Sequence, residues 1–117
     1  MEIDKERLSE ILELHKKWMA GNEVGKRANL RYANLGGANL KNADLRYANL
    51  DYSCLPLWCG SLKVHMDDKQ VKQLLYHTLS IAKHSKNVSE DLKTALLTEK
   101  NLEIANQFHK VEYCGEL

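Results

Sequence analysis

The sequence predicts a mixed fold in which a short repeat solenoid lies between helical segments. Residues 28–57 repeat every five residues, which fits neither the period of a helix, about 3.6 residues, nor the two-residue alternation of a strand. On either side, residues 4–20 and the residues after 66 place apolar side chains at helical spacing. A five-residue period requires a backbone that turns a corner at each repeat, so the repeats define the architecture.

Five consecutive units begin with Ala, then Asn or Asp, then Leu, followed by two variable residues. A sixth unit, residues 53–57, keeps the leucine and a small first residue. This segment resembles the pentapeptide-repeat family. The resemblance implies a mixed α+β protein: a short right-handed quadrilateral β-helix of about one and a half coils, capped by an N-terminal helix and a C-terminal helical segment. It also implies that the small first residues and six leucines point inward: Leu30, Leu35, Leu40, Leu45, Leu50 and Leu55.

Residues 4–20 are predicted to form an amphipathic helix. Asp4 is a typical N-cap, and Gly21 stands where a left-handed C-terminal residue is expected. The apolar stripe includes His15, for which packing is a commoner role than catalysis. We expect this helix to cover the first coil of the repeats.

The C-terminal region is predicted to hold two or three helices. Asp67, Ser89 and Thr98 are expected to cap them, and Gly115 to end the ordered chain. The buried face of the first of these helices is predicted as Val71, Leu74, Leu75, Tyr76, Leu79 and Ala82.

The chain is therefore predicted to have three parts that unfold as one cooperative unit. They are an N-terminal capping helix in residues 1–25, a repeat region in residues 26–57, and a helical region in residues 58–117 that packs on the repeats. A solenoid this short buries little apolar surface, so we also predict a twofold homodimer.

Composition limits the classes of function. The 117 residues carry a net charge of +1, and no apolar run approaches the roughly 20 residues of a spanning helix. Three cysteines do not suit a disulfide framework. We expect a protein of a reducing cytoplasm with no membrane segment.

The sequence lacks a convincing catalytic or metal-binding pattern. No nucleophile stands with a His and Asp at a known spacing, and Gly36-Gly37 lacks the lysine of a phosphate-binding loop. A zinc site could be drawn from five residues, but no second pair follows at finger-like spacing, and buried cysteines are common. We predict no cofactor, no metal site and no enzymatic activity; the five residues are Cys54, Cys59, His65, His77 and Cys114.

The outward positions of the repeats offer a candidate interaction surface. With four repeats per coil, the first and fifth units stack, which places Tyr32 over Tyr52 and Arg31 over Asp51. Tyrosine and arginine are the residues that protein interfaces favour. An equally weighted reading is that the tyrosines cover the leucine layers or meet a helix. The predicted surface consists of Arg31, Tyr32, Arg46, Tyr47 and Tyr52.

These observations favour a non-enzymatic interaction protein. The C-terminal helices resemble, more weakly, those of short phage and prophage members of the family. The resemblance implies a phage-encoded protein of the host cytoplasm that binds and inhibits a host protein, as a counter-defence inhibitor does.

Two alternatives stay open. One is a nucleic-acid-binding or DNA-mimicking module that acts on a DNA-processing enzyme, because some family members imitate DNA. The repeats are short and basic, with five cationic residues against two carboxylates, whereas a DNA mimic needs a long acidic rod. We therefore do not expect nucleic acid as the partner. The other alternative is a protein that sequesters a small nucleotide signal.

Overall fold

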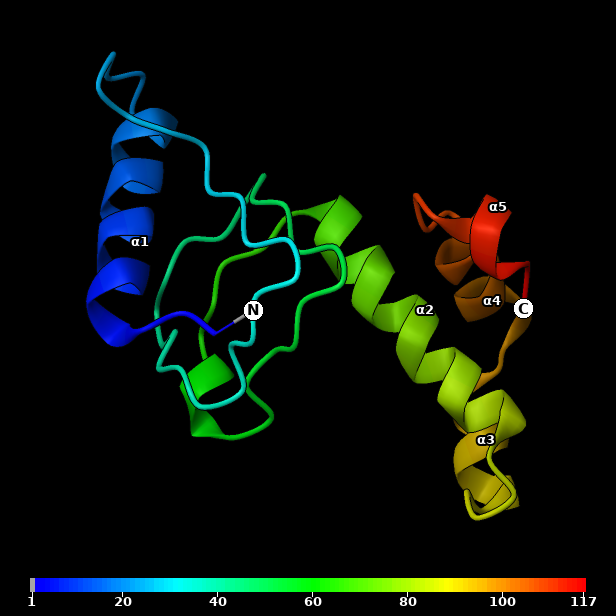
Figure 1. The fold of residues 1–117 in the computed structure, drawn as a ribbon. Coiled ribbons are helices and arrows are strands. Elements are labelled where there is room, and N and C mark those ends of the chain that lie inside the picture. Colours follow the sequence, from blue (N-terminus) through cyan, green and yellow to red (C-terminus); the bar gives the residue numbers. More distant parts are fainter. Residues whose placement is uncertain (1) are drawn as a thin grey trace. The chain divides into compact units, whose positions relative to one another are not determined.

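The protein, seen in a computed structural model that describes residues 2–117, divides into two compact units. The first extends to Asp67 and contains helix α1 and the repeats; the second begins at Asp68 and is helical. Figure 1 follows the chain from the blue α1 through the cyan and green repeats to the orange and red C-terminal helices. Each unit has its own hydrophobic cluster. A single cooperative unfolding transition for the whole chain stays a prediction.

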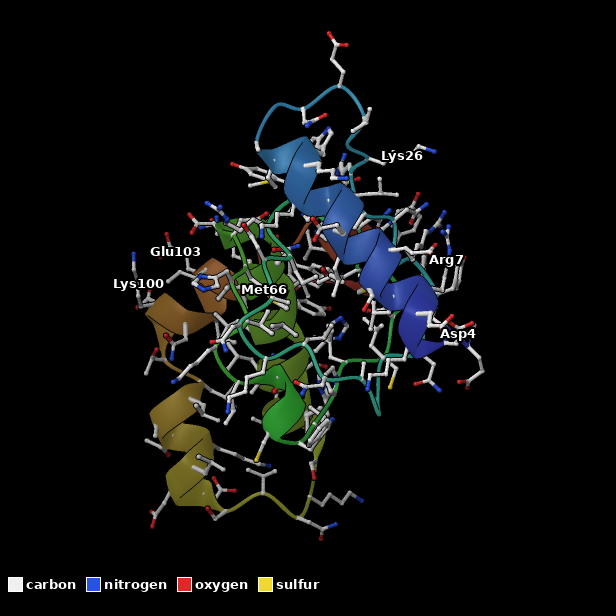
Figure 2. All side chains as sticks on the ribbon, turned by 90° about the vertical axis from the view of Figure 1, so that its left-hand side faces the viewer. Asp4, Arg7, Lys26, Met66, Lys100 and Glu103 are labelled. Atoms are coloured by element: carbon white, nitrogen blue, oxygen red, sulfur yellow. The ribbon has the colours of Figure 1, made fainter. Side chains whose placement is uncertain are left out.

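Helix α1 spans Lys5–Met19 and begins and ends as its sequence indicates. The Asp4 carboxylate accepts a hydrogen bond from the Arg7 N–H at 2.7 Å, and the two residues lie together at the start of the helix in Figure 2. Gly21 adopts a left-handed φ of 79° just after the helix. Both capping predictions are confirmed. The helix contributes buried Leu8 to the cluster formed by the repeats.

In the repeats, successive passes of the chain lie side by side at a spacing of twenty residues. Single parallel bridges join Asn29 to Asn49 and Asn34 to Cys54. The Leu30 N–H donates to the Asn49 carbonyl at 2.9 Å, and the Asn49 N–H to the Ala28 carbonyl at 3.1 Å. The residues after the repeats continue this contact, because the Leu45 N–H donates to the carbonyl of His65 at 2.9 Å.

The predicted fold class is wrong. Across residues 2–117 the structure contains helices but no strand and no sheet, so neither the α+β class nor the quadrilateral β-helix is present. The physical reason lies in the repeat itself. Asn29, Asn34, Asp44 and Asn49 each form an isolated bridge, and after one further residue the chain enters a two-residue turn, so no run of consecutive residues forms the ladder of hydrogen bonds that defines a strand.

The leucines of the repeats form the centre of the first unit. Those at positions 30, 35, 40 and 45 are at most 1% exposed, Leu50 is 8% exposed, and Leu55 is partly buried against them. The small first residues Ala28, Ala33 and Ala48 are buried in the same cluster. Alternating large and alanine-sized side chains fill the narrow interior.

The second unit consists of four helices: α2 (Asp68–His84), α3 (Glu90–Leu96), α4 (Glu99–Ala105) and α5 (Val111–Cys114). A short 3-10 helix, η1 (Cys59–Ser61), precedes them in the first unit. The predicted caps of α3 and α4 are confirmed: Ser89 accepts from the Leu92 N–H at 3.2 Å and Thr98 from the Asn101 N–H at 3.1 Å. Helix α2 packs against α3 and α4.

Two expectations for the second unit are wrong. Val71 and Leu74, predicted to be buried, are 53% and 40% exposed, because α2 turns its Tyr76 and Leu79 face toward the α4 side. The ordered chain also continues past Gly115. The Leu117 N–H donates to the Asn106 side chain at 2.8 Å, and Leu117 packs on the cluster around Phe108.

Candidate protein-interaction surface

The same side-chain turn organises every repeat. The Asn or Asp at the second position accepts, through Oδ1, a hydrogen bond of 3.0–3.1 Å from the backbone N–H two residues later. Such turns are a property of Asn and Asp side chains. The role of this position was not predicted from the sequence. Its signal was visible, because only Asn and Asp occur there in the five full units: Asn29, Asn34, Asn39, Asp44 and Asn49.

The last residue of several repeats adopts a left-handed backbone conformation. Tyr32, Tyr47 and Tyr52 have φ values of 66°, 68° and 61°, and Asn42 has 63°. A residue with a Cβ pays about 1 kcal/mol or more for this conformation, which glycine adopts freely. Tyrosine is thus a costly choice at these corners for the fold alone. The corners hold the three rings outward, each more than half exposed.

Arg31, Tyr32 and Tyr52 form one stacked group, here called the Arg–Tyr cluster. The two rings are parallel within 8°, with centroids 4.8 Å apart, so the predicted stacking is confirmed. The guanidinium carbon of Arg31 lies 5.0 Å from the Tyr32 centroid and 5.1 Å from that of Tyr52. Arginine over an aromatic face is favourable by about 0.5–1 kcal/mol at exposed sites. The cluster therefore presents two rings and a cation in a fixed arrangement.

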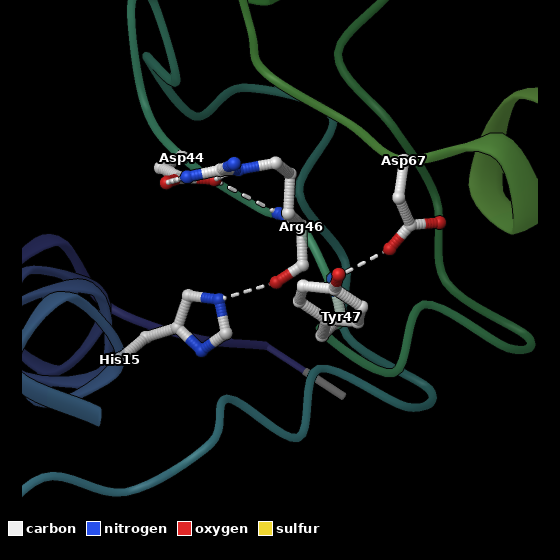
Figure 3. A network of polar contacts seen from close by, with 5 residues as sticks. All are labelled: His15, Asp44, Arg46, Tyr47 and Asp67. Carbon is white, nitrogen blue, oxygen red and sulfur yellow. Dashed lines mark hydrogen bonds and ion pairs between the residues drawn. The ribbon is translucent and has the colours of Figure 1, made fainter. Parts of the chain in front are cut away.

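Arg46 does not join the Arg–Tyr cluster. Its guanidinium forms a two-point ion pair with Asp44, at 3.0 and 2.8 Å. This side-chain hydrogen bond lowers the pKa of the Asp44 carboxyl from its ordinary value, against a smaller opposing effect of burial. Figure 3 shows Arg46 beside Asp44, with its carbonyl turned toward His15. Two N–H groups of the Arg46 guanidinium are thus engaged within its own repeat.

Tyr47 belongs to a second aromatic group. Its ring meets Trp18 of α1 edge-on at 6.3 Å, and its carbonyl accepts a hydrogen bond from the Arg27 side chain. Its N–H donates to the Asp67 carboxylate at 2.7 Å, as Figure 3 shows. The five predicted residues therefore separate into two groups. Arg31, Tyr32 and Tyr52 follow the bridged residues Asn29 and Asn49 in the chain, whereas Arg46 and Tyr47 precede Asn49.

His15 fixes α1 to the repeats. The side chain is fully buried; its Nδ1 accepts from the Ala28 N–H at 3.0 Å, and its Nε2 lies 2.8 Å from the Arg46 carbonyl. Because Nδ1 is the acceptor, the proton resides on Nε2, which donates to Arg46. Packing was predicted for His15, but its hydrogen bonds were not. The only signal was a polar residue within an apolar stripe.

The candidate metal ligands are dispersed. The thiols of Cys54, Cys59 and Cys114 are exposed and free. Within residues 2–117, no group of three or more His, Cys, Asp or Glu side chains is arranged to hold a metal ion. In the same residues, no helix is long and apolar enough to cross a membrane.

The repeats define the class of protein. A family model for pentapeptide repeats matches residues 26–56 and counts eight copies, where the sequence pattern distinguishes six units. Residues 26–56 are therefore pentapeptide repeats, as the sequence indicated. No curated protein and no solved structure matches the chain.

Proposed function

We propose that this chain is a non-enzymatic interaction protein that binds a host protein through the Arg–Tyr cluster and thereby inhibits or modulates it. The proposal includes a phage or prophage origin, action in the host cytoplasm and a counter-defence role. The observation that carries it is the display of Tyr32 and Tyr52 from strained corners, stacked on each other and under Arg31.

The fold does not require tyrosine at these left-handed corners. A glycine or asparagine would form these corners at lower cost, so strain at the two tyrosines is best explained by a use for their side chains. Stacked rings have little conformational freedom left to lose on binding, which favours affinity. Exposed, ordered tyrosine and arginine are typical of the residues that dominate binding energies.

The proposal also includes a twofold homodimer. Helix α2 carries an exposed apolar row of Val71, Leu74 and Ile81, which are 53%, 40% and 65% exposed. The spacing of these residues places them on one side of the helix. A second copy of the chain is the partner proposed for this row, since closed twofold pairing is the commonest arrangement of identical subunits.

Capture of a partner tests the proposed function. The tagged full-length protein and its Tyr32→Gly/Tyr52→Gly variant are exposed to a nuclease-treated bacterial lysate, and the retained proteins are identified by mass spectrometry. We expect one protein to be retained by the wild type and lost from the variant. Equal retention by both would refute the role of the cluster.

The same experiment separates the alternatives. Retention from an untreated lysate that is absent from the nuclease-treated lysate would favour nucleic acid, whose affinity should also fall steeply with salt. A nucleotide released by heating the purified protein would favour ligand sequestration.

A further inference from the structure

The Arg31 guanidinium is held in place but is not used. The chain has four arginines, and three of them have side-chain partners. Arg7 pairs with Glu10 at 3.2 Å, Arg46 pairs with Asp44, and Arg27 donates to the Tyr47 carbonyl. Among the residues that the structure describes, no hydrogen bond or ion pair engages the Arg31 side chain, whose guanidinium lies beside the two tyrosine rings.

The stack leaves the donors of Arg31 available. A guanidinium is planar and carries five N–H donors in its plane, and a cation–π contact with a ring occupies none of them in a hydrogen bond to an oxygen. Two parallel N–H groups match the two oxygens of a carboxylate in a bidentate pair. The rings of Tyr32 and Tyr52 restrict the side chain before any ligand arrives, which reduces the entropy lost on binding.

We infer that Arg31 is the receptor for a carboxylate, supplied by an aspartate or glutamate side chain on the surface of the protein partner. This inference rests on the proposed function and names the chemistry that the partner presents to the Arg–Tyr cluster. The carboxylate binds the in-plane N–H groups of Arg31, and the tyrosine rings provide apolar surface beside it.

Local charge favours a single carboxylate over the phosphates of a nucleic acid. The Asp51 carbonyl accepts the Tyr32 N–H at 3.1 Å, so an acidic residue lies on the pass next to Arg31. Duplex DNA carries a charge about every 1.7 Å, and some of those charges would approach Asp51. A single carboxylate can contact Arg31 from the side that faces away from Asp51.

The test uses full-length 15N-labelled protein and two capped peptides, Ac-Gly-Glu-Gly-Glu-Gly-NH2 and its Gln counterpart. The Nε–H resonances of the arginines are followed by NMR during titration at constant ionic strength. We expect the Glu peptide to shift the Arg31 Nε–H saturably and the Gln peptide to leave it unchanged. Arg31→Lys, which keeps the charge and loses the planar fork, is followed through the backbone amide of Tyr32 and should raise the dissociation constant at least about tenfold. The matched control Arg7→Ala should bind as the wild type does.

Several outcomes would overturn the inference. These are no saturable shift with the Glu peptide, an equal shift at Arg7 Nε–H, equal affinity of the Arg31→Lys variant, or tighter binding of an eight-residue thymidine oligonucleotide at the same resonance. The last outcome assigns the site to nucleic acid.

This test can fail independently of the proposed function. If a captured partner is lost with Tyr32→Gly/Tyr52→Gly but the Glu peptide does not bind, the proposed function is supported and the carboxylate site at Arg31 is refuted. If the peptide binds and no partner is captured, the carboxylate site is supported and the proposed function is refuted.

Discussion

Tyr32 and Tyr52 each have a structural role, at a corner of the repeats, and a proposed role in binding. Each occupies a left-handed corner that costs an L-residue about 1 kcal/mol, and the single stacking contact between the two rings recovers about 0.5–1.5 kcal/mol for the pair. For the fold alone, stacking offsets only part of the cost of the two corners. The remaining effect of the pair is an exposed aromatic platform under Arg31, which carries the proposed binding.

His15 is expected to be the most sensitive single position of α1. His15→Leu fills the buried position with an apolar side chain but leaves the Ala28 N–H and the Arg46 carbonyl without their present partner. An unsatisfied buried polar group costs about 1–3 kcal/mol, so we expect a loss of about 2–4 kcal/mol in the free energy of unfolding. Urea denaturation measures it. His84→Leu, at an exposed position of α2, serves as control and should change stability little. A loss below about 1 kcal/mol for His15→Leu would mean that water replaces the imidazole.

At the scale of elements, two glycines that look alike in sequence should respond in opposite ways. A Cβ at Gly60 would come within 2.5 Å of the Trp58 ring and 2.6 Å of the Ala38 carbonyl, whereas a Cβ at Gly37 meets nothing within 4 Å. We expect Gly60→Ala to destabilise the first unit by about 1–3 kcal/mol, because the backbone at Gly60 must move away from the backbone at Ala38. Gly37→Ala should be neutral. Thermal unfolding of both variants checks this, and similar melting temperatures would contradict the close contact between η1 and the repeats.

The second unit should lose stability in alkali through Tyr76. Burial raises the pKa of its hydroxyl above the ordinary value of 10.0, with a smaller contribution from Cys114, and the hydroxyl donates to the Gly115 carbonyl at 2.6 Å. The folded state thus favours the neutral phenol. Its contribution is fully present below about pH 10 and is lost as the pH rises through the higher folded pKa.

Tyr76→Phe isolates this effect. At about pH 8 the variant should be less stable than the wild type, by about 1 kcal/mol for the lost hydrogen bond. The difference should shrink toward about pH 11, because only the wild type pays to keep a neutral phenol. Urea midpoints at both pH values give the comparison. A constant difference would show that Tyr76 ionises as freely in the folded protein as in the unfolded chain.

The structural elements differ in how well their sequence predicted them. Helix ends were predictable because capping is local: Asp4, Ser89 and Thr98 bond to N–H groups three residues away. The repeats predicted buried leucines, but not whether bridges would extend into strands. That depends on the turn after each bridge, whose Asn and Asp side chains were not interpreted.

The arrangement of α2 and of the Arg–Tyr cluster shows the same limit. Leu74 and Leu75 are indistinguishable in sequence, and only packing against α4 selects the face that is buried. The stack of Tyr32 on Tyr52 followed from the four repeats per coil that the family resemblance implies. The contacts of His15 did not, because they join its side chain to the backbone of Ala28 and Arg46, which are far away in sequence. The ion pair of Arg46 is local, with Asp44 two residues before it, but the sequence pattern did not show which partner the guanidinium would take.

At the scale of the whole molecule, the exposed row of α2 should determine the oligomeric state. We expect sedimentation at micromolar concentration to give a species of twice 13.4 kDa for the wild type. Ile81→Lys places a charge in the row and should give a monomer, whereas Tyr113→Ala, at another exposed apolar position, should leave the dimer intact. A wild-type species near 13.4 kDa would contradict the dimer.

The central claim is that the tyrosines of the Arg–Tyr cluster are kept for binding and not for folding. The most direct measurement is the affinity of the captured host protein for the wild type and for Tyr32→Gly/Tyr52→Gly, by calorimetry, alongside the free energy of unfolding of each. We predict that affinity falls at least about 30-fold, as for residues that dominate an interface, while stability changes by less than about 1 kcal/mol. Tyr113→Ala should leave the affinity unchanged. Affinity within about threefold of the wild type, or a large loss of stability with no separate loss of binding, would contradict the claim.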